Sequence, residues 1–179
     1  TGKLSGGLNA TFARLSAAAN SLGDAYPEAG LIRIDARMVH EAGGSDAQEL
    51  AALIASAVDT LRRLDNRTDI SALVPRMSFA IALDSNYGLG VAKLRAARRL
   101  WARILDAMEL QPVPMRLQAV SSGRILSRYD AWTNMLRTTA AAFAGAVGGA
   151  DILTIRPFNE ALGIPEGLGR RIARNTQLI

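Results

Sequence analysis

The chain has 179 residues, 49% of them apolar, with no cysteine, a single histidine and a formal net charge of +5. This length supports one sizeable core, so we expect a single domain over residues 1–179, and the composition excludes a disulfide framework, a thiolate nucleophile and any metal site that needs two histidines. Every apolar run is interrupted well before the ~20 residues of a membrane span, which predicts a cytoplasmic protein with no membrane partner.

The predicted elements alternate between helices and strands along the chain. Apolar residues at helical spacing predict a helix over 8–22, which ends at Gly23. Residues 30–37 alternate in polarity and predict a strand, and a capping box that begins at Ser45 predicts a helix over 46–64. The same order recurs three times, with strands over 77–83, 115–120 and 152–156 followed by helices over 88–108, 129–147 and 166–179.

Four consecutive strand-helix units predict an α/β fold with a parallel sheet and right-handed crossovers. An open doubly wound sheet would need apolar residues on both faces of each strand, because helices cover both faces. Here large apolar residues occupy one face: Ile32, Ile34, Met77, Phe79, Ile81, Leu83, Met115, Leu117, Leu153 and Ile155. The other face is small or polar: Arg33, Asp35, Arg37, Ser78, Ala80, Ala82, Arg116, Gln118, Val120, Thr154 and Arg156.

This asymmetry favours the C-terminal half of a TIM (β/α)8 barrel over a doubly wound sheet. Barrel interiors are usually filled by bulky branched residues, so the small and polar face indicates either a barrel that holds something else or a sheet with one open face. Four units cannot close an eight-stranded barrel. We therefore expect the remaining strands to precede Thr1 or to belong to a second chain, and the barrel to be truncated at both ends of this sequence.

The predicted helix 88–108 carries a concentration of basic residues, namely Lys93, Arg95, Arg98, Arg99 and Arg103. Aromatic residues do not interleave with them as base-stacking platforms would, so no nucleic-acid partner is predicted. A solvated helix face or a subunit contact is the favoured interpretation. The sequence GLGVAK at 88–93 is a weak match to a phosphate-binding loop, and close helix packing explains its glycines better.

His40 and Glu41 follow the first strand, where a barrel places its catalytic loops. A lone histidine beside a carboxylate is more often a hydrogen-bonded loop residue than a general base, and nothing near it in the sequence supplies a nucleophile. Glu41, Asp84 and Glu160 could line one rim of the barrel, but helix N-terminal regions favour carboxylates in any case. From these patterns alone no catalytic residue and no metal site is assigned.

Several long segments resemble the methylmalonyl-CoA mutase family: EAGGSDAQEL (41–50), PRMSF (75–79), AKLRAARRLWARIL (92–105), YDAWTNMLRTTAAAFAGAVGGAD (129–151) and FNEALGIPEGLGRRIARNTQLI (158–179). The resemblance implies part of an acyl-CoA mutase barrel, in which CoA threads along an axis lined by small polar side chains. Such enzymes interconvert methylmalonyl-CoA and succinyl-CoA with adenosylcobalamin, which a separate C-terminal domain holds. The cofactor supplies the radical chemistry, and the protein encloses it.

The resemblance also implies site residues in this sequence. Arg76 and Ser78 match positions that contact CoA, and a guanidinium suits its phosphates. Glu41 and Glu160 match positions where catalytic members place carboxylates near the adenosyl group of the cofactor. Gln118 stands where a histidine lines the family's substrate channel, which makes it the third substrate-binding residue predicted here.

Other positions depart from the catalytic pattern. Arg37 and Met38 replace a Tyr-His pair that packs on the substrate and hydrogen-bonds its thioester carbonyl, and Val120 replaces a channel glutamine. These losses resemble the non-catalytic small subunit of the two-chain bacterial enzyme, which works with a catalytic large subunit. The charged residues of the polar face, Arg33, Asp35, Arg37, Arg116 and Arg156, could fill the barrel with a salt-bridged network in place of CoA.

Two hypotheses follow from this resemblance. The first is a small subunit that binds no adenosylcobalamin by itself, because the family's cobalamin ligand lies in an Asp-x-His-x-x-Gly sequence, whereas His40, the only histidine here, stands in MVHEAGG. The alternative is a divergent mutase that acts on another acyl-CoA, with Glu41, Arg76 and Ser78 still in use.

Overall fold

The computed structural model describes residues 6–26 and 29–178, apart from the side chain of Asp24. Its α-helices are α1 (Gly7–Ala25), α2 (Arg37–Glu41), α3 (Asp46–Leu64), α4 (Ile70–Leu73), α5 (Tyr87–Ala107), α6 (Asn134–Val147) and α7 (Gly167–Asn175). Short 3-10 helices are η1 (Val74–Arg76), η2 (Gly123–Ile125), η3 (Glu160–Leu162) and η4 (Thr176–Leu178). The strands are β1 (Ile32–Asp35), β2 (Met77–Leu83), β3 (Arg116–Ser121) and β4 (Ile152–Thr154).

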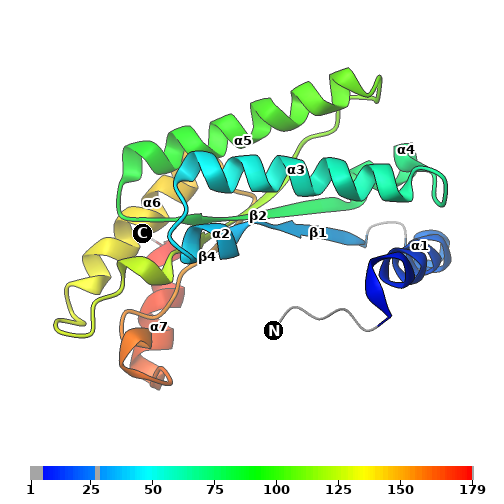
Figure 1. Ribbon diagram of the computed structural model, residues 1–179. Coiled ribbons are helices and arrows are strands. Elements are labelled where there is room, and N and C mark those ends of the chain that lie inside the picture. Colours follow the sequence, from blue (N-terminus) through cyan, green and yellow to red (C-terminus); the bar gives the residue numbers. More distant parts are fainter. Residues whose placement is uncertain (1–5, 27–28, 179) are drawn as a thin grey trace.

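The four strands form one parallel sheet in the order β1-β2-β3-β4, which confirms the predicted α/β class. Consecutive strands that always advance in one direction through right-handed crossovers place their helices on one face of the sheet. Figure 1 shows α3 and α5 lying together on that face. A doubly wound sheet reverses its strand order at a switch point, and this sheet has no such reversal. The order is that of consecutive units in a barrel.

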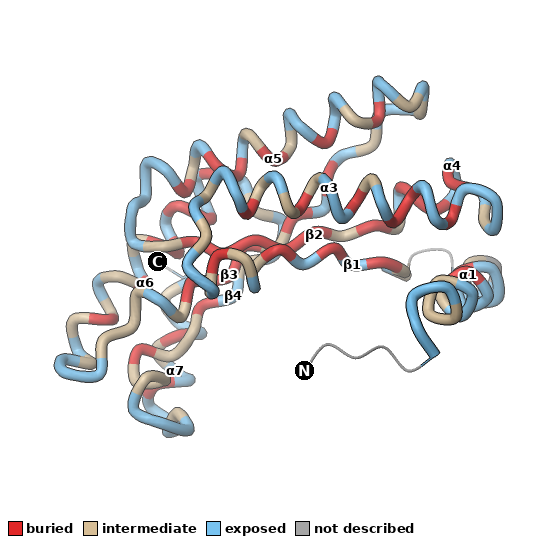
Figure 2. The backbone as a smooth tube through the Cα atoms, in the orientation of Figure 1, coloured by how far each residue is buried: buried red, intermediate tan, exposed pale blue. Residues whose placement is uncertain are grey.

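The core lies between the sheet and these helices. Phe79 of β2 and Trp101 of α5 are both buried, with ring centroids 4.7 Å apart, and the leucines of α3 that face the sheet are fully buried. Figure 2 shows that the buried residues concentrate in the strands and on the sides of α3 and α5 that face the sheet. The close packing expected for the GLGVAK glycines is confirmed at Gly90, where a Cβ atom would lie 2.9 Å from the Cβ of Ala144 in α6.

The opposite side of the sheet, which we call the open face, carries Arg33, Asp35, Ser78, Ala80, Ala82, Arg116, Gln118, Val120 and Thr154. Its charged members on β1 and β3 are exposed, whereas the alanines are buried beside their neighbours. The predicted division into an apolar face and a small or polar face is therefore confirmed. In the part of the chain that the structure describes, no helix is long and apolar enough to cross a membrane.

Several predicted boundaries were wrong. The first predicted helix extends to Ala25, the strand predicted over 152–156 ends at Thr154, and the last predicted helix ends as α7 at Asn175, where η4 follows. The strand predicted over 30–37 ends at Asp35, because the next residues form the short helix α2. The helix predicted from 129 begins at Asn134, whose side chain accepts a hydrogen bond from the backbone N–H of Ser127 and donates one to its carbonyl. These bonds hold the preceding segment as a loop. Ile179, the last residue of the final predicted helix, lies outside the described residues.

Candidate functional site

The carboxyl ends of the strands bring together charged side chains that are far apart in the sequence. The end of β1 leads into α2 with His40 and Glu41, β3 ends at Ser121, and Arg156 follows β4. Ligand sites of parallel α/β sheets lie at this edge. The side chains here form two adjacent clusters, one partly exposed around Arg156 and one buried around Lys93.

Arg156 joins the two carboxylates of the exposed cluster. Its Nη1 lies 2.6 Å from Oε1 of Glu160, and its Nη2 lies 3.5 Å from Oε1 of Glu41. Its Nε donates to the backbone carbonyl of Ser121 at 3.0 Å, and its backbone N–H donates to the Ser121 hydroxyl at 2.7 Å. Four contacts therefore fix the Arg156 guanidinium and backbone between the ends of β3 and β4.

Glu41 has a second internal partner. Its Oε1 accepts a hydrogen bond of 2.9 Å from the backbone N–H of Gly123. A Cβ atom on Gly123 would lie 3.1 Å from Oε2 of Glu41, so the glycine leaves room for this carboxylate. Glu41 and Glu160, predicted separately as cofactor-binding residues, thus meet at one guanidinium. Both carboxylates are partly exposed, and both already have a partner within the chain.

The buried cluster centres on Lys93 of α5. Its Nζ contacts Oδ1 of Asp46 at 2.6 Å, donates to the carbonyl of Ala82 at 2.9 Å and forms a short ion pair with Oε2 of Glu49. Glu49 is fully buried, and its Oε1 accepts a hydrogen bond of 2.7 Å from the Ala82 N–H. The ammonium group therefore lies between two carboxylates and ties α5 to the first turn of α3.

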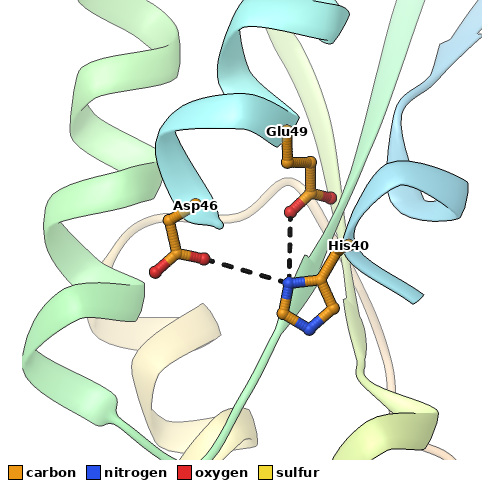
Figure 3. Close-up of side chains that lie close together, drawn as sticks. All are labelled: His40, Asp46 and Glu49. Atoms are coloured by element: carbon orange, nitrogen blue, oxygen red, sulfur yellow. Dashed lines mark ion pairs between the residues drawn. The ribbon is translucent and has the colours of Figure 1, made fainter. Parts of the chain in front are cut away.

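His40 completes this cluster (Figure 3). Its Nε2 lies 2.9 Å from the hydroxyl of Ser122, and its Nδ1 points toward Glu49 and Asp46, at 3.6 Å and 4.0 Å from their carboxylate oxygens. Nδ1 makes no hydrogen bond to any described residue. The imidazole, 3% exposed, thus bridges the first turn of α3 and the end of β3.

Burial dominates the electrostatics of this cluster. It raises the pKa of Glu49, although the Lys93 ammonium and the Ala82 N–H act in the opposite direction. It lowers the pKa of His40, and the positive charges of Lys93 and Arg124 lower it further. A neutral imidazole is therefore the favoured form.

His40, Asp46 and Glu49 have the donor types and spacing of a metal site. The position between the two carboxylates is taken by the Lys93 ammonium, however, so these residues already hold a cation of the chain itself. The arrangement fits an internal ion-pair network better than a metal centre.

Local sequence explains how the buried cluster forms. The Ser45 side chain accepts from the backbone N–H of Gln48, and the Gln48 side chain accepts from the Ser45 N–H, which completes the predicted capping box. The box starts α3 so that Asp46 and Glu49 fall in its first turn, where the helix dipole favours carboxylates. Arg124 then donates to the carbonyls of His40 and Gly44, which fastens the α2–α3 loop to the end of β3.

The three predicted substrate-binding residues lie apart from both clusters. Ser78 and Gln118 are half-buried on the open face, where Ser78 donates to the Ile32 carbonyl and Gln118 donates to the Thr154 hydroxyl at 2.7 Å. Arg76 precedes β2 and therefore lies at the amino ends of the strands, away from the carboxyl ends that carry the two clusters. A Cβ atom on Gly23 of α1 would lie 2.9 Å from its Nη1, so α1 approaches this guanidinium closely.

Arg37 and Met38, the two residues that depart most from the catalytic pattern, begin α2. Arg37 binds Asp35 through Nε at 2.8 Å and Nη2 at 2.5 Å, and Arg33 lies 3.6 Å from the same carboxylate. Partial burial raises the pKa of Asp35, but the hydrogen bonds and charge of Arg37 outweigh it and hold the pKa below its ordinary value. Met38 is 76% exposed.

The basic residues of α5 do not behave as one solvated face. Lys93 is buried in the cluster above, and Arg98 binds Asp151 at 3.1 Å and the carbonyls of Gly148 and Gly149. For these two residues the interpretation as solvated charges was wrong. The helical spacing could have indicated that Lys93 is buried, because it lies toward the apolar side of α5, next to Leu94 and one turn before Ala97. Its carboxylate partners lie on another helix, so the local sequence gives no sign of them.

The fold and these clusters define an α/β protein of consecutive strand-helix units, with a charged network at the carboxyl ends of its strands. Residues 9–179 match the family model described as methylmalonyl-CoA mutase. The chain is 43% identical over 174 residues to the methylmalonyl-CoA mutase small subunit of Streptomyces virginiae, covering 94% of this chain and 28% of that protein. It belongs to the methylmalonyl-CoA mutase family.

Relatives that are not small subunits also match. The chain is 36% identical over 157 residues to the methylmalonyl-CoA mutase large subunit of Streptomyces virginiae, and 38% identical over 159 residues to the mitochondrial methylmalonyl-CoA mutase of Bos taurus. Each match covers 86% of this chain and 21% of the relative. The chain thus spans between 21% and 28% of the length of these three relatives.

Proposed function

We propose that this chain is part of the barrel of a non-catalytic small subunit, which supports a catalytic large subunit in a cytoplasmic, adenosylcobalamin-dependent methylmalonyl-CoA mutase. The observation that carries the proposal is the Arg156 bridge. Both carboxylates expected near the adenosyl group, Glu41 and Glu160, have acceptor atoms engaged by a guanidinium, and Glu41 also binds the Gly123 N–H.

The two carboxylates are held by a cation of the chain itself. A carboxylate that moved to bind an adenosyl ribose would separate from Arg156 and leave a partly buried guanidinium without that partner. The chain therefore takes part in the holoenzyme without contributing Glu41 or Glu160 to the cofactor site. The ion pair between Arg37 of α2 and Asp35 on the open face supports the same role, because it adds a second fixed charge pair beside the position expected for the substrate channel.

A test of this role is assembly together with ligand binding. The full-length parent protein, mixed with a large mutase chain from the same organism, is expected to elute as a stable complex in size-exclusion chromatography. The parent alone is expected to bind none of a series of acyl-CoA esters in calorimetric titration. Saturable binding by the parent alone, weakened by Arg76→Ala or Ser78→Ala, would instead support a divergent acyl-CoA mutase.

A further inference from the structure

An apolar groove runs between α3 and α5 on the side of these helices that faces away from the sheet. It has a volume of about 660 Å³ and is lined chiefly by Leu50, Ala51, Ile54, Ala55 and Val58 of α3 and by Leu100 of α5. Leu100 is 41% exposed, and it also borders a smaller hollow along α5, of about 490 Å³, that includes Ala92 and Ala96. The alanines leave space for a neighbouring backbone to approach.

Unpaired positive charges flank this groove. Arg62 borders it on α3, and Arg95, Arg99 and Arg103 follow the outer side of α5. Among the side chains that the structure describes, none forms a hydrogen bond or ion pair with these four guanidinium groups. The one carboxylate that lines the groove, Asp59, is already bound by Arg63 at 2.7 Å. The surface therefore combines an apolar floor with an uncompensated basic rim.

Completion of a barrel would leave this groove uncovered. α3 and α5 follow β1 and β2, which are adjacent strands, so their helices are already neighbours. Further strand-helix units would add helices beyond β1 or β4, at the two edges of the sheet, and not over the outer surface of this pair. Figure 1 shows α3 and α5 side by side, with their outer surfaces away from the sheet.

We propose that the α3–α5 groove docks an acidic amphipathic helix of a partner polypeptide. The apolar floor follows α3 from Ala47 to Arg62, a length of about 22 Å at 1.5 Å per residue, which matches about four turns of a docked helix. Acidic residues along the edges of that helix would pair with the four arginines. These charge pairs would determine the orientation of the helix and accelerate its association. The proposal concerns the outer surface and does not depend on whether the chain is catalytic.

The test uses an 18-residue fluorescein-labelled peptide with leucine and alanine on one helical face and glutamate along both edges. Its binding to the purified chain is measured by fluorescence anisotropy. The triple variant Arg95→Glu, Arg99→Glu, Arg103→Glu is expected to weaken binding at least about tenfold. Leu100→Ser is expected to weaken it at unchanged charge. The matched control is Arg170→Glu, Arg171→Glu, Arg174→Glu on α7, which makes the same change in net charge and should leave binding intact.

Near-UV circular dichroism establishes that each variant is folded. Saturable binding that requires the α5 arginines and Leu100, and that disappears with a scrambled peptide of the same composition, supports the proposal. Equal loss in the α7 control would show a non-specific charge effect and overturn it. No binding, equal binding of a peptide with lysine in place of glutamate, or displacement of the peptide by phosphatidylserine vesicles or duplex DNA would also overturn it.

Discussion

Replacement of Lys93 by methionine tests the buried cluster most sharply. The variant keeps the length of the side chain but leaves Glu49, which is fully buried, without its ammonium partner. Removal of one partner from a buried ion pair costs about 3–5 kcal/mol of the free energy of unfolding. We therefore expect Lys93→Met to lower that free energy by about 3–5 kcal/mol at pH 8, measured by urea denaturation.

The loss of stability in Lys93→Met should depend on pH. Burial raises the pKa of Glu49 above that of the unfolded chain, and removal of Lys93 raises it further. At a pH between the pKa of Glu49 in the unfolded chain and its higher pKa in the folded variant, the folded state binds one more proton than the unfolded state. The stability of the variant therefore falls as the pH rises through this interval. The loss should thus be smaller at pH 5 than at pH 8, and Glu49→Gln added to Lys93→Met should recover about 2 kcal/mol.

Arg95→Met is the matched control, because Arg95 lies two residues away on α5, is exposed and has no described partner. It should change the free energy of unfolding by no more than about 0.5 kcal/mol. A loss below about 1 kcal/mol for Lys93→Met, independent of pH and unaffected by Glu49→Gln, would refute the buried ion pair.

Three further predictions concern other parts of the fold. Burial lowers the pKa of His40 in the folded state, so the contribution of His40 to stability is lost as the pH falls below about 6.5. The difference in the free energy of unfolding between wild type and His40→Gln, measured by urea titration, should therefore increase from pH 5 to pH 7. A difference that does not change with pH would contradict this. Gly90→Val should destabilise the chain by about 1–3 kcal/mol through overlap with Ala144, whereas Gly88→Ala, with no atom within 3.4 Å of the new Cβ, should raise the melting temperature slightly. Asn134→Ala removes hydrogen bonds to two loop carbonyls and should cost about 2 kcal/mol, with faster amide hydrogen exchange in the loop before α6 as the diagnostic readout.

Sequence patterns predicted the elements that depend on local physics. The capping box at Ser45 and the run of large and small residues over 77–83 gave the bounds of α3 and β2 as the structure has them. The alternation of polarity also separated the open face from the helix-covered face. These features follow from backbone hydrogen bonding and side-chain periodicity within a few residues, so one segment suffices to reveal them.

The contacts of the candidate site could not be predicted in the same way. Lys93 finds its carboxylate partners 44 and 47 residues earlier in the chain, and Arg156 finds Glu41 at a separation of 115 residues. Such pairs depend on which strand ends lie next to each other in the sheet, and this arrangement cannot be deduced from the residue types alone. The substrate-binding positions taken from the family resemblance, Arg76, Ser78 and Gln118, remain predictions, whereas the proposed function assigns Glu41 and Glu160 to the Arg156 ion pairs and not to the cofactor.

Turnover measures the central claim most directly. Methylmalonyl-CoA, adenosylcobalamin and the full-length parent protein are incubated alone and then with a large mutase chain from the same organism, and succinyl-CoA is quantified. We expect no succinyl-CoA from the parent alone and turnover when the large chain is present. Saturable turnover by the parent alone, abolished by Glu41→Gln or Glu160→Gln, would contradict it.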